Sequence, residues 1–237
     1  MDNFWPVKVL RVVSVFFLGA VCIGMYWYPG GNIHNPDQIG YSFTRNFLSD
    51  LGGYESHSGA VNFIAAFFFN TGMFLFVLVG VAFLYVPLLF KEDRVNYRLA
   101  VAGSILFLLG TVFFSGVGLT PHDLYLDLHV FFAVNAFRFL VPGSLLYFIV
   151  LLRSSVANRF AWVSGVYLVC VASYVGYQIM SGNPFDSAEE MIRQATIQKL
   201  IVIASVINIF SLSFAFGHQA RLQRAKLNEK ILITLAI

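Results

Sequence analysis

Charged residues are scarce in this sequence. Lys, Arg, Asp and Glu make up 11% of its 237 residues, and 58% are hydrophobic, whereas a soluble domain carries about 25% charged residues. Cysteine is also rare, and Cys22 and Cys170 both lie inside apolar runs, so they do not form the disulfide framework of a secreted domain. The sequence contains no Gly-rich phosphate loop, nucleophile elbow, His-Glu-x-x-His pair or c-type haem motif. These absences exclude a soluble domain and the familiar soluble-enzyme chemistries.

Long runs of apolar residues recur along the whole chain. A helix needs about 20 apolar residues to cross a bilayer, and the strands of a membrane barrel alternate apolar and polar residues in segments of about ten. The runs here are continuous and longer than such strands, so they predict an all-α fold. We expect one polytopic transmembrane domain over residues 1–237, a bundle of six helices. The spans lie near 8–28, 58–90, 96–119, 124–152, 160–180 and 194–217.

Basic residues between the spans predict the orientation. Eleven Lys and Arg fall on one side of the six spans, whereas the other side has only Arg45 and Arg193 together with eight Asp and Glu. Lys and Arg favour the cytoplasmic side, so both termini are expected inside. The basic residues do not gather with aromatics into a patch, which argues against nucleic-acid binding. The eleven are Lys8, Arg11, Lys91, Arg94, Arg98, Arg153, Arg159, Arg221, Arg224, Lys226 and Lys230.

The segment GLTPHDLYLDLH, residues 118–129, has the pattern of a helix start. Thr120 suits an N-cap, Pro121 suits the first helical position, and Asp123 completes an acidic variant of the capping box. We therefore expect the fourth helix to begin at Pro121. At about 100° per residue, Asp123, Asp127 and Arg138 then share one stripe of this helix, and His122 and His129 share another.

These residue types permit a metal site but leave its composition open. A tetrahedral zinc site needs three or four convergent ligands, and the two stripes do not meet at one ion, so another segment has to contribute. Asp50 and His57 are the available donors. In the alternative interpretation Asp123 only caps the helix, Asp127 is solvated and the histidines form hydrogen bonds at the membrane interface.

Arg138 is the most unusual residue of the spans. It lies about 16 Å below Asp127 on a helix, close to the bilayer midplane, where a cation is costly unless it faces the bundle interior or water. We expect it to point into the bundle and meet polar groups there, such as Asn135 or the carbonyl that Pro142 leaves without its helical donor. It then either binds an anion, a carboxylate or a lipid phosphate, or clamps two helices together.

The first outer connection, roughly 29–57, is too long to be a simple link between helices. Its centre, NFLSDLGGY at 46–54, pairs the apolar Phe47 and Leu48 with polar residues and a glycine turn, so we expect it to fold back as a lid near the outer mouth of helix four. Lys199 is expected to snorkel outward from helix six. The tail after His218 alternates basic and apolar residues, so it either lies along the inner leaflet or frays, and we expect it to fray.

These motifs resemble the uncharacterised six-helix membrane family known as domain of unknown function 998. The resemblance rests on FLSDLGG at 47–53, GLTPHDLYLDLH at 118–129 and RQATIQKL at 193–200, and it covers nearly the whole chain. It implies a fold and a membrane location more than a reaction. The Ser49 and Asp50 pair is similar to that of DRAM-like lipid-associated membrane proteins. A more distant similarity is to alkaline-ceramidase-like and adiponectin-receptor-like membrane hydrolases, whose zinc site uses histidines and an aspartate. This sequence lacks their late His-x-x-x-His pair and their seventh span.

Three functions fit these observations. The first is an outward-facing polar pocket over a buried arginine that handles a lipid head group or small anion, with hydrolysis possible. The second is a transporter or channel with Arg138 on its path, and the third is a structural subunit of a membrane complex. We expect membrane lipids as partners and a prokaryotic cytoplasmic membrane as the location, while activity, metal and cofactor stay open. The candidate ligand-binding residues are Arg138, Asp50, Asp127, His129, His122, His57 and Asn135.

Overall fold

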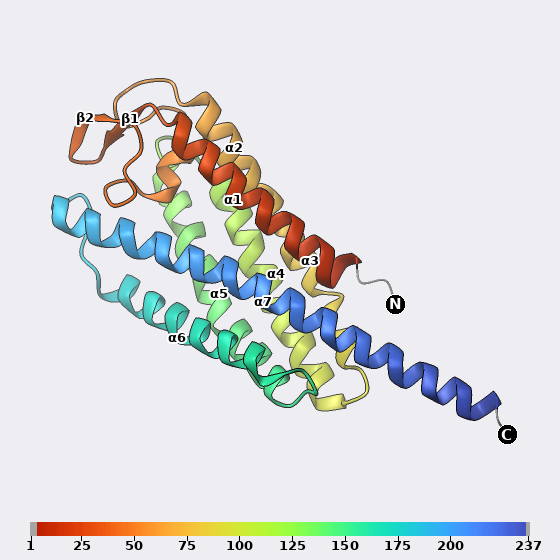
Figure 1. The fold of residues 1–237 in the computed structure, drawn as a ribbon. Helices are drawn as coiled ribbons and strands as arrows, with labels where there is room; N and C mark the ends of the chain where they lie inside the picture. Colours follow the sequence, from red (N-terminus) through yellow and green to blue (C-terminus); the bar gives the residue numbers. More distant parts are fainter. Residues whose placement is uncertain (1–3, 236–237) are drawn as a thin grey trace.

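The computed structural model describes residues 4–235, and it confirms the helical bundle (Figure 1). Within this range six helical segments are long and apolar enough to cross a membrane. Figure 1 shows that the two ends of the chain lie at one end of the bundle and the β1–β2 hairpin at the other. The six segments are Phe4–Trp27, Phe63–Phe90, Arg94–Leu119, Leu126–Leu152, Asn158–Met180 and Ala188–Thr234.

The individual elements follow from these spans. The first span is α1 (Leu10–Trp27), preceded by the π-helical stretch Phe4–Val9. The second is divided into α2 (Phe63–Leu75), α3 (Val77–Phe83) and a 3₁₀ stretch, Val86–Phe90. The later spans are α4 (Arg94–Leu119), α5 (Leu126–Leu152), α6 (Asn158–Met180) and α7 (Ala188–Leu235).

The first outer connection carries the remaining elements. Strands β1 (Gly30–Asn32) and β2 (Asn35–Ile39) pair antiparallel, with Gly30 opposite Ile39 and Asn32 opposite Asn35. A 3₁₀ helix, Leu48–Gly52, follows, and its Leu48 and Leu51 are buried against the bundle. The connection therefore folds back, as its apolar anchor predicts.

Aromatic side chains fill the bundle at the end opposite the hairpin. Phe83 stacks on Phe107 with 4.5 Å between ring centroids, and Tyr147 and Phe216 pack edge-on or tilted against them. The Tyr147 hydroxyl lies 2.7 Å from Ser104 Oγ, which donates to the Phe83 carbonyl. Buried hydroxyl groups are thus paired within the apolar core, as a membrane interior requires.

Two predicted helix boundaries are wrong. The fourth span begins at Leu126, because residues 121–125 form a turn; Thr120 instead closes α4 by donating to the Gly116 carbonyl. The helical hydrogen bond that Pro142 cannot donate does not interrupt the fourth span, because Pro142 lies inside a continuous α5. The tail after His218 does not fray, since α7 continues as one helix to Leu235 and projects beyond the bundle in Figure 1.

Candidate functional site

A polar pocket of about 570 Å³ lies beneath the first outer connection, at the hairpin end of α5, α6 and α7. Five of the seven predicted site residues line it. Its wall also includes Ser49, Gln198 and two tyrosines of α6, Tyr174 and Tyr177. The five predicted residues are Asp50, His57, His122, Asp127 and His129.

Arg138 and Asn135 are not among the residues that line this pocket, so the prediction of a buried arginine at its floor is wrong. The Arg138 side chain is exposed on the surface of α5 and donates to Asn135 Oδ1 at 3.4 Å. The inward face of α5 is occupied by apolar residues, among them Ala136, Phe137 and Leu140. Since Arg138 follows Phe137 by about 100° around the helix, it lies outside that face.

Asp50 is held in one orientation by its own segment. Its Oδ2 accepts hydrogen bonds from the Asn46 amide at 3.0 Å and from the Phe47 backbone N–H at 2.9 Å. Its side chain is 4% exposed, and its Oδ1 lies 3.4 Å from His57 Nε2. One carboxylate oxygen is therefore fixed by hydrogen bonds, while the other faces the histidine.

His57 reaches this carboxylate because its main chain packs against the hairpin. Its backbone N–H donates to the Tyr28 hydroxyl at 3.3 Å. Gly31 has φ +80°, and a Cβ there would lie 2.3 Å from Ser58 N, so this close approach requires glycine. Burial is the largest single effect on the pKa of His57 and lowers it, but the Asp50 and Asp123 carboxylates together raise it by more, so the net shift is upward.

His122 is brought to the same point by the turn between α4 and α5. The neighbouring Asp123 accepts the backbone N–H groups of Tyr54 at 3.0 Å and Glu55 at 2.9 Å, which ties this turn to the first connection. A Cβ at Gly53 would lie 2.7 Å from His122 Cε1. Burial lowers the pKa of His122, so its imidazole is neutral at pH 7.

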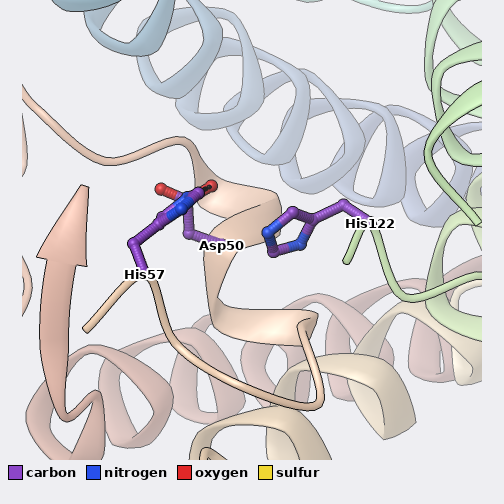
Figure 2. A group of neighbouring side chains, drawn as sticks. All are labelled: Asp50, His57 and His122. Atoms are coloured by element: carbon purple, nitrogen blue, oxygen red, sulfur yellow. Dashed lines mark ion pairs between the residues drawn. The ribbon is translucent and has the colours of Figure 1, made fainter. Parts of the chain in front are cut away.

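Asp50, His57 and His122 together form a compact cluster (Figure 2). One potential ligand atom from each lies within 4.8 Å of the other two. His129 lies beside the cluster, with 6.1 Å between its ring centroid and that of His122. Its Nδ1 lies 2.6 Å from the Thr120 carbonyl, which can only accept, so Nδ1 donates and Nε2 is left as the acceptor.

Sequence analysis missed Lys199. Its side chain does not snorkel outward; it is 2% exposed, and Nζ donates to the carbonyls of Asn46 and Ala195. Next to it, Gln198 Oε1 accepts the backbone N–H of Leu48 at 2.8 Å. Helix α7 therefore fastens the Asp50 segment to the bundle. The available signal was a lysine in the first turns of an apolar span. It lies on the side of the first outer connection, whose backbone carbonyl groups can accept its hydrogen bonds.

An apolar cavity of about 80 Å³ lies next to the polar pocket, inside the bundle. The two share Ser49, His129, Ala133 and Gln198 as lining residues. Farther in, the wall consists mainly of Phe, Leu, Val, Ile and Met side chains. A polar chamber at the end of the helices thus adjoins an apolar one between them.

The spans and the composition give this chain the architecture of a multi-pass membrane protein. No protein-family model, curated protein or solved structure matches it. Membership in the domain of unknown function 998 family therefore stays a proposal based on the three motifs.

Proposed function

We propose that this protein binds a membrane lipid by its head group, with the polar pocket on the non-cytoplasmic face of a prokaryotic cytoplasmic membrane. The observation that carries this proposal is the junction of the two cavities. Amphiphilic ligands need a polar and an apolar compartment in contact, and the shared residues His129, Ala133 and Gln198 provide that contact. In this proposal the apolar cavity receives the apolar part of the lipid that adjoins its head group.

The transporter or channel alternative receives less support. It required Arg138 on a polar path through the midplane, but Arg138 is exposed outside both cavities. The polar side chains of the inner cavity include Tyr167, Ser205 and Asn208, and each is engaged in a hydrogen bond within the bundle. A continuous hydrophilic route is therefore not supported.

A steric variant tests the proposal. Ala133→Phe places a ring at the junction, whereas Ala172→Phe adds the same ring on the exposed side of α6. Each purified protein is delipidated, reconstituted in nanodiscs of defined phospholipids and analysed by native mass spectrometry for retained lipid. We expect wild type and Ala172→Phe to retain a lipid that Ala133→Phe loses. Equal retention by all three folded proteins would refute a head-group pocket at this junction.

A further inference from the structure

We propose that Asp50, His57 and His122 bind a divalent transition-metal ion, with zinc as the best fit. The donor set of one carboxylate oxygen and two imidazole nitrogens is typical of zinc, whereas magnesium and calcium prefer oxygen ligands throughout. This inference deepens the proposed function, because it specifies how a lipid head group is held. Metal binding by these three residues does not itself depend on lipid.

The separation of the Asp50 and His57 ligand atoms matches such a site, and His122 lies near them. Two ligands each about 2.0–2.1 Å from a tetrahedral zinc lie about 3.3–3.4 Å apart, and Asp50 Oδ1 lies 3.4 Å from His57 Nε2. All three ligand atoms lie within 4.8 Å of one another. The widest gap therefore has to close by at most about 1.4 Å when a metal ion binds.

Two buried nitrogen atoms favour a ligand at this point. His122 Nδ1 is shielded from solvent and has no hydrogen-bond partner among the described residues, and His57 Nε2 is shielded likewise, with the Asp50 carboxylate at 3.4 Å as its ion-pair neighbour. Buried polar atoms are nearly always paired, and an unpaired one is destabilising. One metal ion would satisfy both nitrogens at once and neutralise the buried Asp50 carboxylate.

The surrounding residues hold the three ligands independently of any metal. Asn46 and Phe47 fix the second oxygen of Asp50, and Asp123 fixes the turn that carries His122. Such outer-shell partners are characteristic of metal sites in proteins.

The three ligands leave one tetrahedral position open. Because all three residues line the polar pocket, we place that position toward the pocket, where water or a head-group oxygen would fill it. Three protein ligands with one open position are the pattern of zinc sites that act on a bound molecule, whereas purely structural sites have four protein ligands. A metal ion would also supply the positive charge for a phosphate or ester oxygen that Arg138 does not supply.

The test measures metal binding directly. Protein purified on an affinity tag without histidine is stripped with chelator, titrated with Zn²⁺, washed and analysed by elemental mass spectrometry. We expect one tightly held zinc per chain in wild type. His57→Gln and His122→Gln are each expected to weaken binding at least tenfold, whereas His34→Gln, which changes an exposed histidine outside the cluster, is expected to retain it.

A spectroscopic measurement covers the case in which a histidine variant fails to fold. X-ray absorption of zinc-loaded wild type is expected to give two imidazole ligands and oxygen ligands, and Co²⁺ in its place to give the visible bands of tetrahedral coordination. Absence of bound zinc in wild type, zinc retained by both folded histidine variants, or a site without imidazole would each overturn the proposal. Ala133→Phe separates the two proposals, because it should lose lipid and keep zinc.

Discussion

Replacing Lys199 by Met tests whether α7 holds the Asp50 segment in place. The substitution keeps an unbranched apolar side chain of similar length but removes the ammonium group. Lys199 Nζ bonds the carbonyls of Asn46 and Ala195 and lies 5.4–5.6 Å from the ring centroids of Phe43 and Tyr41. All of these groups are buried or partly buried except Phe43, which is exposed.

The expected cost follows from which carbonyl loses its partner. Ala195 lies four residues before Lys199, so its carbonyl also accepts a helical hydrogen bond and loses little. The Asn46 carbonyl keeps only a weak contact of 3.5 Å from the Tyr41 hydroxyl. Leaving a buried carbonyl without a full hydrogen bond costs about 1–3 kcal/mol. Because the Tyr41 contact remains, we expect Lys199→Met to lower the free energy of opening of the Asp50 segment by about 1–2 kcal/mol. That change raises the population of the open segment about 5- to 30-fold.

Trypsin cleavage after Arg45 measures this opening. Arg45 is exposed and directly precedes Asn46, and cleavage follows the open population when reclosing is fast. We expect Lys199→Met to be cut there about 5- to 30-fold faster than wild type. The control is Lys226→Met, which removes an exposed ion pair with Glu92 in the projecting part of α7, and it should leave cleavage at Arg45 unchanged. Equal rates in wild type and Lys199→Met would refute the fastening role.

Three further outcomes are expected. In a cysteine-free background, Ser155→Cys should resist an impermeant maleimide in intact cells and react after lysis; labelling in intact cells would reverse the proposed N-in, C-in orientation. Gly53→Ala should lower the melting temperature and abolish the tetrahedral Co²⁺ spectrum, since its Cβ would lie 2.7 Å from His122 Cε1, whereas Gly19→Ala, with nothing within 4 Å, should do neither. Arg138→Leu should retain both lipid and zinc, and loss of either by the folded protein would show that Arg138 contributes to the site.

The number of spans could be predicted from the sequence because bilayer thickness sets the length of each apolar run. The boundaries were less accurate where local signals competed. Thr120, Pro121 and Asp123 have the residue types of a helix start, yet the Asp123 carboxylate accepts two backbone N–H groups from residues 54 and 55 instead. A capping pattern specifies which donors a carboxylate can accept but not which segment supplies them, and here the partners lie about 70 residues away in the chain.

That alternative use of Asp123 also explains why the cluster was only partly predicted. The stripe argument treated His122 as a helical residue and so separated it from the carboxylates, but the turn at 121–125 frees His122 from the register of α5. Asp50 and His57, which both belong to the first connection, then lie close to His122. The Gly52–Gly53 turn permits this meeting, because a side chain at either position would collide with α2 or with His122. The motifs at 47–53 and 118–129 therefore supply Asp50 and His122 to one cluster, which His57 completes.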